Sequence, residues 1–216
     1  MKRLILQLGM VLVSSVFFLS GLSGLGPMPF AEGADASDVR KARDVLQEIS
    51  RIPETAIPPA LLKNAEGIAI IPSLIKAGFI VGGRYGNGIV MVRDAKGAWG
   101  SPREISMSGV SIGWQIGVQS IDLVLVFKTR KSVEDMTKRK WTLGVDGSVA
   151  AGPIGRRAKV ATDIWLKAEV FAYSRSRGIF AGISVDGGVL EAGEKVNAPD
   201  ATKKLIAILS KYTNSK

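Results

Sequence analysis

One segment of the sequence has the residue spacing of a hydrolase nucleophile. Gly109-Val110-Ser111-Ile112-Gly113 fits the G-x-S-x-G pattern, in which a serine on a sharp turn between a strand and a helix attacks a carbonyl carbon. That chemistry needs a histidine to accept the serine proton, and the chain contains none. The residues after Ser111 also alternate like a strand, so we expect Ser111 to lie in a sheet. We therefore predict that the protein is not an enzyme, with a hydrolase that uses Ser111 or Asp122 as the remaining alternative.

Asp122 is the other residue with a chemistry-bearing side chain in an unusual place, because it interrupts the apolar run Ile121–Phe127. A buried carboxylate without a partner is costly, so we expect Asp122 either to face solvent or to accept hydrogen bonds from nearby backbone or from Gln119. The chain has no Cys and no His, which excludes disulfides and metal sites built on thiolate or imidazole ligands. No carboxylates have the spacing of a calcium-binding loop. We predict no metal site and no cofactor.

Basic residues form short clusters near aromatic residues. The net charge is +10, from 29 Lys and Arg against 19 Asp and Glu, and Trp141, Trp165 and Tyr173 lie close to the clusters in sequence. Cations beside amphipathic aromatics suit the anionic surface of a membrane. No nucleic-acid-binding motif accompanies them, so we expect no nucleic-acid partner. The candidate lipid-binding residues are Lys138, Arg139, Lys140, Arg156, Arg157, Lys159, Arg175 and Arg177.

The first 36 residues have the pattern of a secretory signal peptide. Met1-Lys2-Arg3 is basic, Leu4–Leu25 is mostly apolar, and Ala34 and Ala36 form an A-x-A cleavage pattern. An uncleaved membrane anchor is the alternative, because about 20 apolar residues can span a bilayer. We predict a signal peptide at 1–36, a single domain at 37–216, and export to the periplasm or cell envelope.

Hydrophobic periodicity predicts helices at both ends of this domain and a sheet between them. Helices are expected over about 37–52, from Pro58-Pro59, from Ser132 as N-cap to Lys138, and from Pro199 to Tyr212. Strands are expected near 78–85, 88–94, 103–108, 111–118, 121–128, 141–151, 166–175, 177–185 and 188–191.

The glycines of these segments predict a strongly curved sheet. Gly86-Asn87-Gly88 and Gly187-Gly188 are expected to be turns and not phosphate-binding loops, because neither opens a predicted helix. Glycines inside strands mark bends, bulges or close backbone approach. The predicted fold class is α+β, with a curled, Gly-rich antiparallel β-sheet, open or barrel-like, and N- and C-terminal helices packed on it.

Several blocks of the sequence resemble the SYLF-domain family, in the same order, from about Lys41 to Gly193. These blocks are Gly67–Pro72, Gly82–Gly86, Gly117–Asp122, Ala151–Arg156 and Ala168–Gly182.

The resemblance implies a lipid-binding module with no established enzymatic activity. Eukaryotic members bind phosphoinositides at membranes, and some are linked to actin. For an exported bacterial chain, the resemblance implies an anionic phospholipid or another amphiphile as the ligand. It maps no lipid-contacting residue onto this chain. We predict a non-enzymatic lipid- or membrane-binding protein of the cell envelope. The alternative is a structural or partner-binding protein whose basic face docks an acidic protein or polymer.

Overall fold

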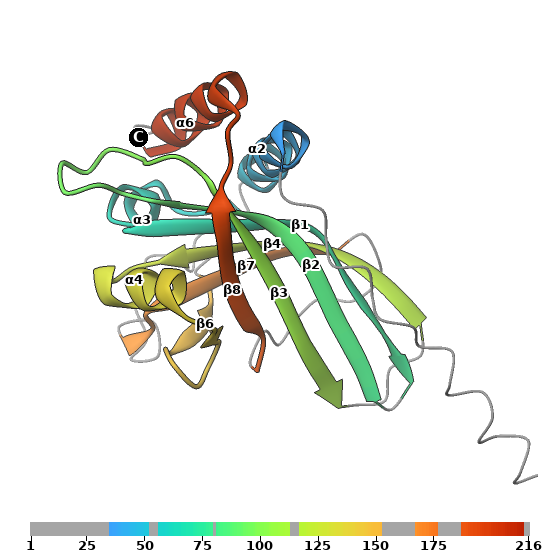
Figure 1. The fold of residues 1–216 in the computed structure, drawn as a ribbon. Coiled ribbons are helices and arrows are strands. Elements are labelled where there is room, and N and C mark those ends of the chain that lie inside the picture. The colour runs from blue at the N-terminus through green and yellow to red at the C-terminus, as the bar shows by residue number, and fades with distance from the viewer. Residues whose placement is uncertain are drawn as a thin grey trace, which may run out of the picture. The chain divides into compact units, whose positions relative to one another are not determined.

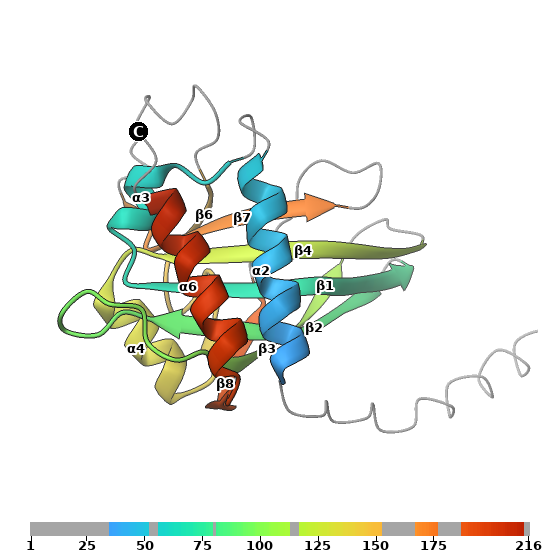
Figure 2. The same cartoon turned by 90° about the horizontal axis from the view of Figure 1, so that it is seen from above.

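Two helices from opposite ends of the domain lie side by side on one face of a curled sheet (Figure 1, Figure 2). The computed structural model describes residues 35–51, 56–79, 81–112, 117–152, 167–176 and 187–213. The described helices are α2 (Ala36–Arg51), α3 (Pro59–Lys63), α4 (Arg130–Lys138) and α6 (Pro199–Thr213). All four helices were predicted. The N-cap of α4 is Thr129, which accepts a hydrogen bond from the backbone N–H of Ser132, and not Ser132 itself.

The sheet has eight described strands in the order β5-β8-β3-β2-β1-β4-β7-β6. The strands are β1 (Gly67–Phe79), β2 (Val81–Val92), β3 (Arg103–Ile112), β4 (Gly117–Phe127), β5 (Trp141–Thr142), β6 (Val149–Ala151), β7 (Val170–Ser176) and β8 (Val189–Lys195). Neighbouring strands are antiparallel except β6 and β7, which are parallel. The predicted α+β class with a curled sheet and terminal helices is confirmed, and the sheet is mixed.

The two edges of the sheet are consecutive in the chain. β5 and β6 occupy opposite edges, yet only residues 143–148 connect them. Within this connection Leu143 and Gly147 form an isolated bridge, and the N–H of Gly144 donates to the carbonyl oxygen of Gly147. So short a connection requires the edges to approach each other, which makes the sheet an incompletely closed barrel.

The central strands are buried on both faces. Ile68 and Ile70 pack with α2 and α6 in an outer core, whereas Ala69 and Ile71 point into an inner core with Trp141 and Met136 of α4. This double burial explains why the run Ile68–Ile71 is apolar without alternation. The amphipathic pattern of α2 serves this outer core, because Val39, Ala42, Val45, Leu46 and Ile49 are all buried there.

A β-bulge divides β1 into a covered half and an uncovered half. The register with β4 shifts between Ile71 and Leu74, where Pro72 and Ser73 oppose the single residue Asp122. Pro72 has no N–H to give to a ladder, and a bulge is one of the few strand positions where proline fits. Ser73 takes a left-handed backbone conformation, with φ of 55°. The bulge therefore bends the four long strands near their middle.

The segment Gly86-Asn87-Gly88 is the clearest correction to the predicted strands. It is not a turn, because all three residues pair with β3 inside β2. The first two predicted strands, 78–85 and 88–94, are replaced by β1, which ends at Phe79, and β2, which begins at Val81. A Cβ on Gly88 would lie 2.0 Å from the carbonyl oxygen of Ile70. Glycine is required here because the backbone of bulged β1 presses on β2.

Tyr173 allows a prediction about stability in alkali. Its ring is buried in the outer core, and burial raises its pKa above the usual value of about 10. Above pH 10 the unfolded chain releases this proton while the folded chain retains it. Stability from this group is therefore complete below pH 10 and falls by about 1.4 kcal/mol per pH unit above it. Tyr173→Phe should show a shallower loss of unfolding free energy between pH 10 and 11 in urea titrations. Parallel pH dependence in both proteins would contradict the assignment.

Candidate functional site

The serine of the G-x-S-x-G pattern lies in a strand. Gly109–Ile112 is the last part of β3, and β4 begins at Gly117. A nucleophile elbow needs a helix directly after the serine. With β4 following so soon after β3, the arrangement is a strand-to-strand connection and does not have the geometry of an elbow.

Three predicted lipid-binding residues lie at and just after the C-terminus of α4, each beside a carboxylate. Lys138 is 3.6 Å from Glu134, Arg139 is 2.9 Å from Asp146, and Lys140 is 3.1 Å from Glu191. The N–H of Thr142 and the guanidinium of Arg139 hold the pKa of Asp146 below its usual range. The three cations are exposed, but their charge is partly offset by acids within the protein.

A fourth predicted residue, Arg175, belongs to a partly buried network of charged side chains. Its guanidinium lies 2.6 Å from Glu48 of α2 and 3.8 Å from Asp122 of β4. Asp122 is only 2% exposed and accepts a hydrogen bond of 3.0 Å from the N–H of Ser73. The alternative of an Asp122 held by nearby backbone is therefore the observed one. Arg175 and Asp122 together attach α2 to the sheet beside the bulge.

The remaining predicted residues, Arg156, Arg157, Lys159 and Arg177, lie outside the described residues, as do residues 1–34 of the predicted signal peptide and the predicted strand 177–185. Their role in lipid binding stays a prediction.

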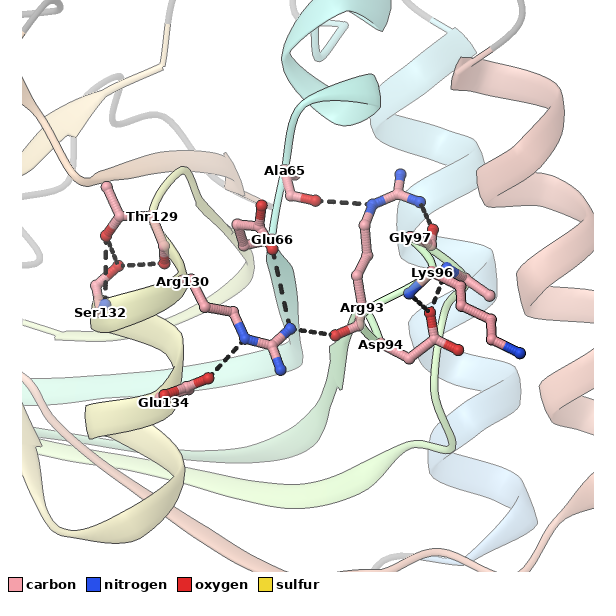
Figure 3. Close-up of polar contacts among 11 residues, drawn as sticks. Ala65, Glu66, Arg93, Asp94, Lys96, Gly97, Thr129, Arg130, Ser132 and Glu134 are labelled. Atoms are coloured by element: carbon pink, nitrogen blue, oxygen red, sulfur yellow. Dashed lines mark hydrogen bonds and ion pairs between the residues drawn. The ribbon is translucent and has the colours of Figure 1, made fainter.

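Two further arginines stabilise the fold (Figure 3). Arg93 donates to the carbonyl oxygens of Ala65 and Leu62 at 2.8 and 3.1 Å, and its guanidinium lies 4.1 Å from the ring centre of Trp99. Arg130 donates to the carbonyl oxygen of Arg93 and to Glu134, as Figure 3 shows. Hydrogen bonding by Arg130 holds the pKa of Glu134 below its usual range. Both arginines join the start of β1, the end of β2 and α4.

The helices that cover the outer face of the sheet carry exposed cations that form no ion pair within the described part of the chain. Acids of α2 are engaged within the protein, because Asp38 pairs with Lys41, Asp44 with Arg43, and Glu48 with Arg175. The helical cations, by which we mean the exposed Lys and Arg of α2, α3 and α6 that form no ion pair with a described residue, are Arg40 and Arg51 of α2, Lys63 of α3, and Lys203 and Lys204 of α6. Exposed cations without such an ion pair also occur outside these helices, at Lys96, Lys131, Lys167 and Lys195. Clustering along the sequence missed the helical cations because they come from three separate helices.

The uncovered end of the sheet is the second feature that sequence reasoning missed. β1, β2 and β4 run past α2 in Figure 2, and there the sheet exposes Ile75, Tyr85, Val110 and Val118. We call these four residues the apolar end. The sequence contained a signal for this surface. No acidic residue occurs between Glu66 and Asp94 or between Glu104 and Asp122.

The described residues show no cluster of three or more Asp or Glu side chains able to hold a metal ion. Among the same residues, no helix has the length and apolar character to cross a bilayer.

Known proteins resemble this chain over most of its length. The Ysc84 family profile, described as "Las17-binding protein actin regulator", matches residues 108–211, from β3 to α6. LAS seventeen-binding protein 3 of Saccharomyces cerevisiae is 37% identical over 182 residues, which cover 79% of this chain and 39% of the yeast protein. The chain belongs to the SYLF-domain (Ysc84) family.

Animal relatives show the same extent of similarity. SH3 domain-containing YSC84-like protein 1 is 38% identical over 167 residues in Homo sapiens and 39% identical over 165 residues in Xenopus laevis. The matches cover 74% and 73% of this chain, and 48% and 49% of those proteins. The chain thus spans less than half the length of the curated relatives that it matches. What it shares with them is the SYLF domain.

Proposed function

We propose that this SYLF protein is a non-catalytic module that binds anionic lipid surfaces in the cell envelope, after export through its N-terminal segment. The observation that carries the proposal is the set of helical cations, which form no ion pair with an acid of the described residues. The apolar end of the sheet supports it, because an amphiphile needs both attraction and a water-excluding contact.

The expected binding free energy indicates that electrostatic attraction alone does not give micromolar binding to a membrane. Each cation near an anionic bilayer contributes about 1 kcal/mol, so the helical cations together contribute roughly 5 kcal/mol. Micromolar binding needs about 8 kcal/mol. One or two buried apolar side chains, at about 1.5–3 kcal/mol each, would supply the difference.

A protein partner is the second candidate. The matching family is described as Las17-binding and actin-regulating, and a basic face could dock an acidic protein or polymer in the same way. Binding to protein-free vesicles separates the two candidates.

Replacing Arg40 and Arg51 tests the lipid proposal. We expect R40Q/R51Q to weaken binding to vesicles that contain phosphatidylglycerol by about 30-fold, because two charges at about 1 kcal/mol each are lost. The measurement is co-sedimentation of the full chain, and in parallel of Gly33–Lys216, at low and high salt.

K138Q/K140Q is the matched control, because it also lowers the net charge by two but removes cations that lie beside Glu134 and Glu191. Its loss should be several-fold smaller. Equal losses would show that only total charge matters. Equal binding of the wild-type protein to anionic and to neutral vesicles at low salt would refute the proposal.

A further inference from the structure

The apolar end has an ordered arrangement across four strands. Val118, Ala77, Gly83 and Val110 lie directly opposite one another across β4, β1, β2 and β3. A second row lies two positions farther from the strand ends. In this row Ile75 of β1 pairs with Tyr85 of β2, and the pair is flanked by Ser120 of β4 and Ser108 of β3. All of these positions share the face of the sheet that α2 and α6 cover elsewhere, because Val124 and Ile89 of the outer core continue the same alternation.

These side chains are exposed although the same face is fully buried beyond the bulge. Val118 is 76% exposed and Val110 is 67% exposed, against 0% for Val124 and Ile89. Ile75 and Tyr85 are 44% and 41% exposed. Contiguous exposed apolar side chains mark a contact surface, whereas single ones need no explanation.

The described charged residues on the uncovered parts of β1 and β2 are all basic. Between Glu104 and Asp122 the chain has no charged residue, and between Glu66 and Arg93 it has only Lys76 and Arg84. Lys76 and Arg84 are paired across β1 and β2, and alternation along the strands places them on the face opposite to the apolar end. They are one position farther from the strand ends than the row that contains Val110 and Val118. Burial and the neighbouring Arg84 lower the pKa of Lys76, so a nearby anion would favour its charged form.

Spacing along the strands matches the layers of a bilayer surface. At about 3.4 Å per residue, Val110 and Val118 lie roughly 3–7 Å from the ends of β3 and β4, and Lys76 lies roughly 10 Å from the end of β1. Interfacial protein segments insert about 5–10 Å into the boundary between head groups and acyl chains. Insertion to this depth would immerse both valines and leave Lys76 level with the lipid phosphates. Tyr85, a few ångströms farther out, would lie where tyrosine is enriched in membrane proteins.

We propose that the ends of β1–β4 insert into the surface of an anionic bilayer, with Val110 and Val118 among the acyl chains and Lys76 at the phosphates. This inference rests on the proposed lipid-binding function and adds which part of the protein enters the lipid. α2 is the helix nearest to the strand ends (Figure 2), so a tilted bilayer also meets the cations of α2. A protein partner fits less well, because the described residues of the apolar end include no carboxylate to pair with basic residues on a protein.

Single cysteines with an environment-sensitive dye test the insertion, since the chain has no cysteine of its own. V110C and V118C are labelled in the full chain, and V145C is the control, because Val145 is 79% exposed but lies in the turn between β5 and β6. With vesicles containing phosphatidylglycerol, we expect blue-shifted, brighter emission at positions 110 and 118, and quenching by lipids spin-labelled near the head group. Position 145 should not respond. Each dye reports its own surroundings, whichever other segment holds the protein on the vesicle.

A second measurement uses unlabelled V110S/V118S. It should weaken binding to the same vesicles by about tenfold or more, corresponding to at least about 1.4 kcal/mol, with unchanged thermal unfolding because both sites are exposed. Co-sedimentation without a dye response at positions 110 and 118 would overturn the insertion and leave the proposed function intact. Absence of co-sedimentation would overturn both. A concentration-dependent response without vesicles would assign the apolar end to a second copy of the chain and overturn the insertion.

Discussion

Gly88→Ala should be among the most destabilising single substitutions in this protein. We expect it to lower the free energy of unfolding by about 4 kcal/mol, or to prevent folding. The added Cβ would lie 2.0 Å from the carbonyl oxygen of Ile70 and 2.8 Å from the Cα of Ile71. Both are backbone atoms, so no side-chain rotation relieves the overlap. The bulge that presses β1 onto β2 would have to open.

Gly83→Ala is the matched control for this substitution. Gly83 lies in the same strand, but a Cβ there would meet no atom within 4 Å. Its unfolding free energy should stay within about 0.5 kcal/mol of wild type. Urea denaturation followed by circular dichroism gives both values, with soluble yield as the readout if Gly88→Ala does not fold. Equal stability of the two variants would show that β1 does not approach β2 in this way.

Asp122→Ala should have the second largest effect, a loss of about 3 kcal/mol. The carboxylate is buried, accepts the hydrogen bond from the N–H of Ser73 at the bulge, and lies beside Arg175. Its removal leaves the part-buried N–H of Ser73 without its acceptor and Arg175 without this ion-pair partner. Breaking one side of a buried charge pair costs about 3–5 kcal/mol. Partial exposure of Arg175 places the expected loss at the lower end.

Two variants separate the hydrogen bond from the charge. Asp122→Asn keeps an oxygen for the N–H of Ser73 and should lose less stability than Asp122→Ala. Asp44→Ala removes a carboxylate from an exposed ion pair with Arg43 and should cost less than about 1 kcal/mol. If Asp122→Ala costs no more than Asp44→Ala, the network does not attach α2 to the sheet.

Helices were predictable from the sequence because their signals are local. The apolar spacing of α2 and the prolines that begin α3 and α6 act within one or two turns. The bounds of the strands were not predictable from turn residues. Gly86-Asn87-Gly88 has the composition of a turn, but its glycines are needed because the bulged strand β1 lies too close to leave room for a side chain. When glycine is required because a strand distant in sequence comes close, the local sequence looks the same as that of a turn.

The same limit applies to the candidate binding residues. Lys140 and Arg175 belong to basic clusters in the sequence, but their partners Glu191 and Glu48 come from distant segments. Conversely, Arg40, Lys63 and Lys203 stand apart along the chain, and the fold places their helices in one layer. Sequence predicted a cationic protein correctly, while the location of unpaired charge depends on tertiary structure.

The strand order of the sheet has a consequence for the order in which the strands pair during folding. β1, β2, β3 and β4 are continuous in the chain, so their pairing closes short or moderate loops. By contrast, β8 must join β3 by pairing Lys195 with Arg103, which are separated in sequence by about half of the domain. Contacts of high sequence separation form late. Until they form, a nascent or refolding chain exposes apolar surface on both sides of a half-built sheet, a state prone to aggregation. We expect protection from aggregation to depend on the docking of β8 and α6, which follow β1–β4 in the chain and complete the sheet and the outer core.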